Sequence, residues 1–284
     1  MNTAHIRGID IAYYEAGSGP AVMLLHGYPF DRSMWREQID FLSAHGHRAI
    51  APDLRGLGKT SDKLQFVGDV DYSSSERQAE AYGTITTMDY MAGDVAALMD
   101  ELRIDRAVIC GLSMGGYVAF EFAHLFPARV SALVLAGTRA PADNEQEKQA
   151  RFQQVEQMLA NGMTGIAEAS LPKLLSSRTL AEEPEVVARV REMILRAAPE
   201  GAAAAQRGMA ARRDYSDDLP NIKAPALVIV GREDPIRPVA DAEFMHRALS
   251  GSALVIIEDA AHMTNMEQPE VFNRALQEFL RSFH

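Results

Sequence analysis

The segment Gly111-Leu112-Ser113-Met114-Gly115-Gly116 decides the fold class of this chain. It follows a short apolar run that ends at Cys110, and it opens a helical pattern that continues to Phe126. A serine on so sharp a turn between a strand and a helix has strained backbone angles, and only small neighbours fit beside it. Gly111 and Gly115 satisfy that requirement. The sequence therefore predicts that the Ser113 hydroxyl stands exposed at a helix N-terminus, where it can act as a nucleophile.

Outward from this turn, short apolar runs alternate with longer amphipathic segments. We expect buried strands at Ala21–Leu25, Arg48–Ala51, Ala107–Cys110, Ala132–Leu135, Ala226–Val230 and Ala253–Ile257. Helical patterns occupy Met34–Ser43, Thr87–Leu102, Gly115–Phe126, Ala240–Leu249 and Pro269–Phe283. The segment His5–Glu15 alternates and predicts a leading antiparallel strand. This order predicts an α/β fold with a mostly parallel sheet and helices on both faces.

Two stretches interrupt the alternation. Arg139–Asp218 contains no strand pattern, and its prolines at 172, 184 and 199 divide it into about three or four helices. We interpret it as a helical insertion between two strands of the sheet. Ser61–Gly83 is rich in aspartate and serine and predicts a long loop, either a functional lid or a disordered segment.

Composition excludes several classes of protein. The 284 residues include 28 Lys or Arg and 39 Asp or Glu, so the net formal charge is −11, which argues against nucleic acid or an anionic membrane as a partner. Cys110 is the one cysteine, so no intrachain disulfide can form. The first ten residues carry no apolar run, and no later run is long enough to span a membrane. We expect a cytoplasmic protein. The spacing of histidines and carboxylates suggests no metal site.

A serine nucleophile needs N–H donors that face the negative oxygen formed during the reaction. The backbone N–H of Met114, directly after the serine, is one expected donor. The loop His26-Gly27-Tyr28-Pro29 follows the strand Ala21–Leu25 and supplies a second donor, the N–H of Tyr28, because proline has none. We interpret His26 as a buried residue that shapes this loop and not as the catalytic base.

The chain has eight histidines, and position separates one of them from the rest. His262 lies in a loop just past the strand Ala253–Ile257, at the sheet edge where ligands bind in open α/β folds. Past Ala226–Val230, either Glu233 or Asp234 could orient the imidazole, and Asp234 is favoured because Pro235 fixes an extended turn there. The chain order is then serine, aspartate, histidine.

These residues closely resemble the α/β-hydrolase superfamily. The matching motifs span nearly the whole chain: Leu25–Pro29, Trp35, Pro52–Gly58, Gly111–Gly116, Gly231–Pro235 and Asp259–Met263. The resemblance implies an eight-stranded sheet with a helical cap after the sixth strand, which fits residues 139–218, with a core of residues 1–138 and 219–284. It is strongest to the esterase, lactonase and C–C-bond hydrolase branch. Serine as nucleophile argues against dehalogenases and epoxide hydrolases, which carry aspartate.

The resemblance and the residues together predict a serine hydrolase of carboxylic esters or lactones. Ser113 attacks, His262 is the base and Asp234 orients it, with no cofactor. The cap is expected to supply an apolar substrate pocket from Phe152, Met158, Met163 and Met193. A C–C-bond hydrolase or a cofactor-free perhydrolase would use the same three residues, and a receptor-like member that binds a small molecule is a further alternative. A homodimer is compatible with the sequence.

Overall fold

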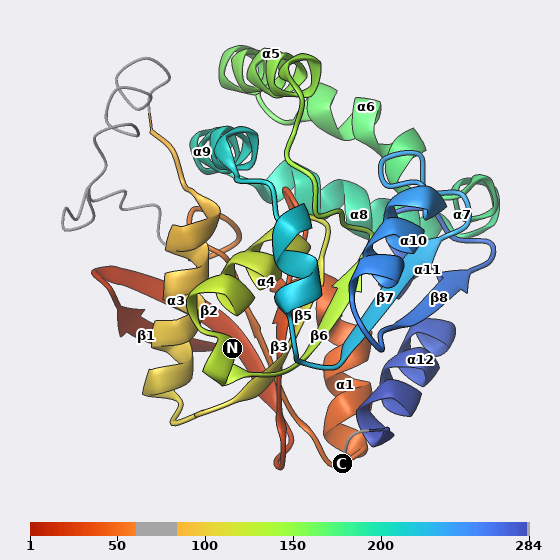
Figure 1. The fold of residues 1–284 in the computed structure, drawn as a ribbon. Coiled ribbons are helices and arrows are strands. Elements are labelled where there is room, and N and C mark those ends of the chain that lie inside the picture. The colour runs from red at the N-terminus through yellow and green to blue at the C-terminus, as the bar shows by residue number, and fades with distance from the viewer. Residues whose placement is uncertain (61–83, 283–284) are drawn as a thin grey trace.

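The computed structural model describes residues 1–60 and 84–282, so the loop predicted at Ser61–Gly83 lies outside the described residues. Within them, eight strands form one sheet in the order β1-β2-β4-β3-β5-β6-β7-β8 (Figure 1). The strands are β1 (Asn2–Ile6), β2 (Ile9–Ala16), β3 (Ala21–Leu25), β4 (Arg48–Pro52), β5 (Ala107–Leu112), β6 (Val130–Ala136), β7 (Ala226–Gly231) and β8 (Ala253–Ile257). Strand β2 is antiparallel to both of its neighbours, β1 and β4. From β4 to β8 every pairing is parallel.

The central strands are buried along almost their whole length because helices cover both faces of the sheet. One face is covered by α3 (Met88–Glu101) and α4 (Met114–Leu125), and the other by α1 (Arg36–Ala44) and α12 (Pro269–Arg281) (Figure 1). A further helix, α10 (Val239–Ala248), packs on β7 and β8. The described part of the chain contains no helix that is both long enough and apolar enough to cross a membrane.

The six strands expected in the body of the sequence are confirmed within two residues at each end. The expectation of one leading strand is wrong in number, because β1 and β2 form a hairpin in which Ile6 pairs with Ile9. Arg7 and Gly8 make the turn with positive φ angles of 48° and 75°. Glycine at the second turn position accepts this conformation without strain, and that glycine was the overlooked signal.

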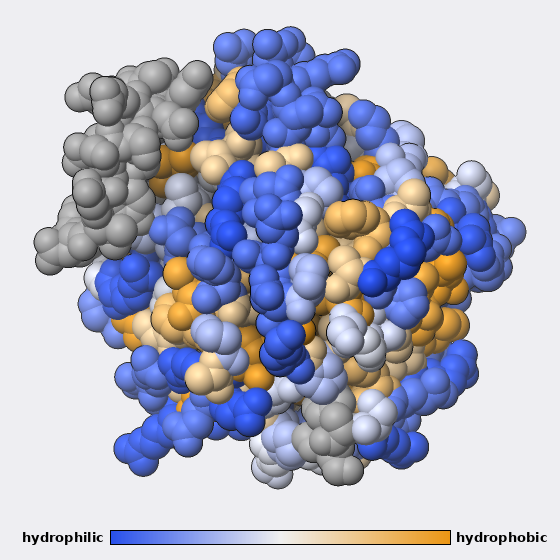
Figure 2. All heavy atoms as spheres, in the orientation of Figure 1, coloured by the Kyte–Doolittle hydropathy of each residue, from blue (hydrophilic) through white to orange (hydrophobic). Residues whose placement is uncertain are grey.

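The helical insert is the run of helices between β6 and β7, and it lies above the sheet at the top of Figure 1. It comprises α5 (Glu145–Asn161), α6 (Thr164–Leu174), α7 (Ser177–Glu182), α8 (Pro184–Arg196) and α9 (Pro199–Ala211). A short 3-10 helix at Ser216–Asn221 follows it. Hydrophilic side chains cover the outer side of α5 (Figure 2).

The insert has five α-helices, and not the three or four expected from its prolines. Pro184 and Pro199 do begin helices, but Pro172 lies within α6. The additional breaks occur at Gly162, which ends α5 with a φ of 73°, and at Ser176, whose side chain caps α7 by accepting from the N–H of Thr179. The exact limits of the insert as a unit, 139 and 218, stay a prediction.

Candidate active site

Ser113 occupies the turn between β5 and α4 with φ 56° and ψ −112°, a conformation that non-glycine residues rarely adopt. Its N–H donates to the carbonyl of Ala136 in β6 (2.9 Å), and its own carbonyl accepts from the Thr138 hydroxyl (2.9 Å). These bonds from the neighbouring strand hold the strained backbone in place. Leu112 and Met114 are fully buried, whereas Ser113 is partly exposed. Among these three residues of the turn, Ser113 is therefore the one that is both polar and partly exposed to solvent.

The glycines around Ser113 are required by close backbone approaches. A Cβ on Gly111 would lie 2.1 Å from the carbonyl oxygen of Gly115, and a Cβ on Gly115 would lie 2.1 Å from that of Leu25. A Cβ on Gly116 would meet the Thr138 side chain at 2.5 Å. Each of these distances is far below van der Waals contact, so the turn packs against β3 and β6 only because these positions lack side chains.

His262 and Asp234 form a buried hydrogen-bonded pair past the ends of β8 and β7. Nδ1 of His262 lies 2.7 Å from Oδ2 of Asp234, and their side chains are 3% and 0% exposed. The other carboxylate oxygen accepts the N–H groups of Ile236 (2.8 Å) and Arg237 (2.9 Å). Because a carboxylate only accepts, Nδ1 carries the proton and Nε2 of the neutral ring is left to accept one. Glu233, the alternative acid, instead accepts from the N–H of Ser177 in the insert (3.2 Å).

One backbone segment lies against both Ser113 and His262. Ala136 accepts the N–H of Ser113, and the next residue, Gly137, donates to Ile229 of β7 (2.9 Å). A Cβ on Gly137 would lie 3.4 Å from the imidazole of His262. Adjacent parallel strands thus bring the serine turn, the acid loop and the histidine loop to one edge of the sheet.

The loop after β3 lies beside the serine turn, because Leu25 of β3 pairs with Gly111 of β5. A Cβ on Gly115 would lie 2.9 Å from the carbonyl oxygen of His26, so the loop that carries Tyr28 lies beside the start of α4, where the N–H of Met114 has no acceptor within its own helix. His26 is fully buried and shapes the loop. Its Nδ1 bonds the carbonyl of Gly27 (2.8 Å), and its Nε2 accepts the N–H of Leu54 (2.9 Å). Burial lowers the pKa of His26, and both ring nitrogens are occupied, so it has no nitrogen available to act as a base.

The four residues expected to line a substrate pocket are placed differently from one another. Met158 is buried in α5, and its sulfur receives the Tyr28 hydroxyl at 3.7 Å, which puts it beside the loop after β3. Met163 is buried at the start of α6, and Phe152 is half-buried in α5. Met193 of α8 lines a separate cavity of about 670 Å³ that also contacts Arg32 and Arg196. A common pocket for all four stays a prediction.

A buried cluster of charges beside the site escaped sequence analysis. Asp143 accepts from Arg139 (2.8 Å), Arg212 (2.8 Å) and Arg151, and its side chain is 1% exposed. Burial alone would raise the pKa of Asp143, but bonds and charges from Arg151 and Arg212 outweigh burial and hold it well below its usual range. Tyr117 of α4 lies against the same cluster, under the guanidinium of Arg212 (4.1 Å to the ring centroid). Arg139 and Arg151 are close to Asp143 in the sequence, but no spacing predicts the contact with Arg212.

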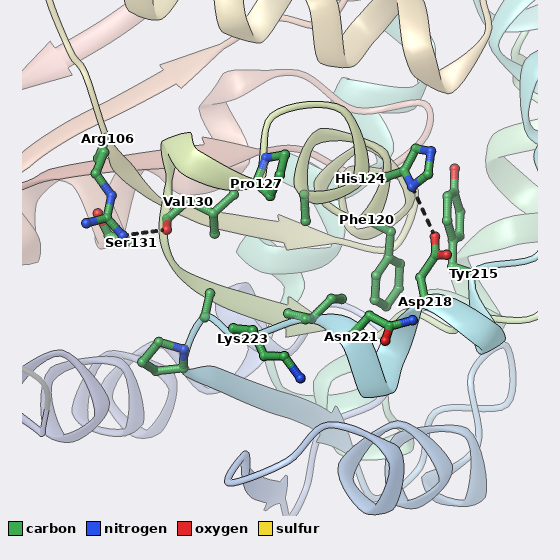
Figure 3. A pocket seen from close by; sticks show the side chains of 14 residues that line it. Arg106, Phe120, His124, Pro127, Val130, Ser131, Tyr215, Asp218, Asn221 and Lys223 are labelled. Atoms are coloured by element: carbon green, nitrogen blue, oxygen red, sulfur yellow. Dashed lines mark hydrogen bonds and ion pairs between the residues drawn. The ribbon is translucent and has the colours of Figure 1, made fainter.

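A cavity of about 420 Å³ lies away from this edge of the sheet (Figure 3). Val130, the first residue of β6, and Pro225, just before β7, line it, so it opens at the amino ends of these strands. In Figure 3, His124 points toward Asp218 (3.5 Å) at the rim. Ser113, Asp234 and His262 are not among its lining residues. Among the described residues, no group of three His, Cys, Asp or Glu side chains is arranged to hold a metal ion.

Comparison with known proteins agrees with this architecture. A family model described as the alpha/beta hydrolase fold matches residues 20–269, and the chain belongs to that family. It is 30% identical to 3-oxoadipate enol-lactonase 2 of Acinetobacter baylyi over 99% of this chain and 96% of that protein. A thermophilic esterase from Thermogutta terrifontis is 40% identical, with a TM-score of 0.88 over 99% of this chain and 97% of that one. A putative non-heme bromoperoxidase, BpoC, of Mycobacterium tuberculosis is 28% identical over 96% of this chain and 98% of that protein. The chain is a hydrolase of this family.

Proposed function

We propose that this protein is a serine hydrolase of small carboxylic esters, lactones included. The observation that carries the proposal is the buried 2.7 Å pair of His262 and Asp234 on the same sheet edge as the strained, partly exposed Ser113. A serine hydroxyl is a weak nucleophile at neutral pH unless a base takes its proton. The carboxylate fixes the imidazole with Nε2 as acceptor, which is the protonation state that this base needs. The similarity to an esterase and an enol-lactonase supports the same substrate class.

The reaction follows from these groups in two halves. Ser113 Oγ attacks the acyl carbon while His262 takes the hydroxyl proton, and the N–H groups of Met114 and Tyr28 bind the resulting oxyanion. The C–O bond to the leaving alcohol then breaks, and the imidazolium gives that oxygen its proton. In the second half, His262 takes a proton from water, the hydroxide attacks the acyl-enzyme, and Ser113 recovers its proton as the acid departs. No cofactor is required.

The wall beside the oxyanion donors is apolar on the side of Met158, which contacts Tyr28 from α5. We infer that the insert covers the bound ester as a cap and that the acyl or alcohol group packs against this methionine. A small neutral ester or lactone is therefore the ligand that we expect, and not a nucleic acid or a membrane surface.

A second candidate is perhydrolysis, in which hydrogen peroxide replaces water in the second half-reaction. The similarity to the putative bromoperoxidase favours it as an alternative, since the same serine, histidine and aspartate would serve. The two functions differ in the acyl acceptor. They are separated by comparing acid and peracid formation from one acyl ester at graded peroxide concentrations.

The deciding experiment measures hydrolysis of nitrophenyl esters from acetyl to octanoyl, and of simple lactones, by wild type and Ser113→Ala. We expect the variant to lose at least about 10³-fold in kcat. Ser131→Ala is the matched control, because Ser131 lines the cavity of Figure 3 at the other end of β6, and its rate should equal that of wild type. An organophosphonate should add covalently to wild type and not to Ser113→Ala. A Ser113→Ala enzyme that keeps its rate, or labels equally, excludes the proposal.

A further inference from the structure

Tyr117 and Arg237 join the helix that follows the nucleophile to the loop that carries the acid. Tyr117 lies in the first turn of α4 and is 1% exposed. Its hydroxyl oxygen accepts from Nε of Arg237 (3.2 Å) and also from Nη2. A guanidinium offers only donors in a planar fork, so the phenol oxygen is the acceptor of both bonds. Arg237 is itself buried, and a buried guanidinium requires such partners.

The same arginine holds the carboxylate of Asp234. Its backbone N–H donates to Oδ1 of Asp234 (2.9 Å), while Oδ2 of that carboxylate receives Nδ1 of His262. Its Nη1 donates to the carbonyl of Ile236 (2.6 Å), which fixes the side chain against its own loop. The position of the Arg237 backbone is therefore linked to α4 through one side chain and to the acid through one N–H.

The charges of three arginines from different elements act on Tyr117. Arg237 comes from the acid loop, Arg212 from the end of the insert, and Arg151 from α5. Burial alone would raise the pKa of Tyr117, but these three positive charges outweigh it and lower the pKa. Because the guanidinium is charged, the bonds that the phenol oxygen accepts from Arg237 are stronger than bonds between neutral groups.

We propose that Tyr117 is a positioning residue for catalysis, which acts through Arg237 to hold the Asp234 carboxylate against His262. The inference rests on the proposed function, because it assigns Tyr117 to the same site. The imidazole gains a proton as the serine attacks, and the fixed carboxylate stabilises that charge only in the correct place. Without the phenol oxygen, Nε and Nη2 of Arg237 lose their shared acceptor, and the side chain can turn toward another acid such as Asp241 of α10, on which its charge already acts.

The test compares Tyr117→Phe with Tyr215→Phe. Tyr215 is equally buried, its hydroxyl bonds the carboxylate of Glu121 (2.8 Å), and its ring stacks on Phe120 of the same helix. Both variants lose one buried phenol oxygen, but only Tyr117 contacts the acid loop. We expect Tyr117→Phe to lower kcat about tenfold, as for a small misplacement of a catalytic group, with KM unchanged within about twofold. Tyr215→Phe should keep the kcat of wild type.

The hydrogen bond from His262 to Asp234 supplies a readout that does not depend on turnover. The proton on Nδ1 of His262, assigned by its absence in His262→Gln, is followed by NMR. A displaced Asp234 carboxylate accepts a weaker hydrogen bond, so this proton resonance should move upfield in Tyr117→Phe. Arg237→Lys keeps the charge but loses the fork, and it should shift the resonance in the same direction.

These measurements separate the two proposals. A wild type that hydrolyses no ester overturns the proposed function, whereas the Nδ1 proton resonance of His262 still reports on Tyr117. If Tyr117→Phe keeps both the Nδ1 proton resonance and the kcat of wild type, or if Tyr215→Phe loses as much kcat, Tyr117 is a packing residue and the inference is wrong. Equal melting temperatures of the two phenylalanine variants exclude a general loss of fold as the cause.

Discussion

Asp143 and Arg212 form an ion pair of 2.8 Å in which the side chains are 1% and 0% exposed. The aspartate precedes the first helix of the insert and the arginine follows the last one, so the pair joins the two ends of the insert. Arg139 and Arg151 contact the same carboxylate. Arg139 also pairs with Glu147 (2.7 Å), but loss of Asp143 would leave the fully buried Arg212 without this carboxylate partner.

We therefore expect Asp143→Asn to lower the free energy of unfolding by about 3 kcal/mol, the cost of breaking a buried pair on one side. Urea denaturation measures it. Asp217→Asn, at an exposed position in the following 3-10 helix, is the control and should change the free energy of unfolding by less than about 0.5 kcal/mol. Equal effects of the two substitutions would contradict the importance of the buried cluster.

The pH dependence of the free energy of unfolding should also depend on the carboxylate of Asp143. The pKa of Asp143 is lower in the folded protein than in the unfolded chain, where it is about 3.9. The stabilisation of the folded protein by the ionised Asp143 is fully present above the unfolded pKa. It is lost as the pH falls from the unfolded pKa toward the folded pKa, because in this range the unfolded chain binds a proton and the folded protein does not. The difference in unfolding free energy between wild type and Asp143→Asn should narrow on acidification below pH 4. A constant difference down to pH 2.5 would refute this.

Alanine at Gly111 should disrupt the serine turn, because its Cβ would meet the carbonyl of Gly115 at 2.1 Å. Separation of these two backbones displaces Ser113, so we expect Gly111→Ala to lose at least about 10²-fold in kcat/KM. Gly165→Ala is the matched control, since Gly165 is helical and nothing lies within 4 Å of its Cβ position. That control should leave the rate unchanged and raise stability by about 0.5 kcal/mol. An active Gly111→Ala enzyme would show that the turn tolerates side chains.

Neighbouring acids allow a paired test of the orienting residue. Asp234→Asn keeps the shape of the side chain but lets its amide present the wrong hydrogen-bonding group to His262, and we expect kcat to fall about 10³- to 10⁴-fold. Glu233→Gln removes the same charge one residue earlier, where the carboxylate only accepts the N–H of Ser177. Its kcat should stay within about twofold of wild type. If Glu233→Gln lost more kcat than Asp234→Asn, Glu233 and not Asp234 would be the residue that orients His262.

Substitutions of the two buried histidines, His26 and His262, should affect stability and kcat differently. His262→Gln removes the base, and kcat should fall at least about 10³-fold with stability nearly unchanged. His26→Asn breaks at least one of the bonds to Gly27 and Leu54, so we expect a loss of about 2 kcal/mol in stability and a smaller loss of kcat. Thermal unfolding and steady-state kinetics on both variants check this. An inactive but fully stable His26→Asn protein would assign it a chemical role.

The sequence predicted what is encoded locally. The strand, the glycines and the helix around Ser113 are contiguous, so their pattern specifies the turn without knowledge of the rest. Asp234 and His262 are predicted to meet because each follows a strand and the ends of parallel strands share an edge, and the structure places them 2.7 Å apart. The family and the sheet follow from the same signals and are confirmed.

Contacts between distant segments were not predictable in the same way. Tyr117 and Arg237 are separated by 120 residues, and their bond depends on the angle at which the acid loop leaves β7. Arg139 and Arg151 are near Asp143 in the sequence, but Arg212 meets it only after five helices have packed, and no periodicity encodes that packing. The additional helix boundaries at Gly162 and Ser176 do have local signals. A capping residue, however, indicates a helix boundary less strongly than a proline does.

The position of the insert between β6 and β7 sets an order of events during synthesis. The serine turn docks on Ala136 of β6, and both are translated before the insert, whereas the acid and the histidine follow it. A nascent chain therefore carries its serine without the base that would activate it. Under the proposed function, we therefore expect activity to begin only when β7 and β8 join the sheet after the insert, and a chain truncated within the insert to be inert toward esters.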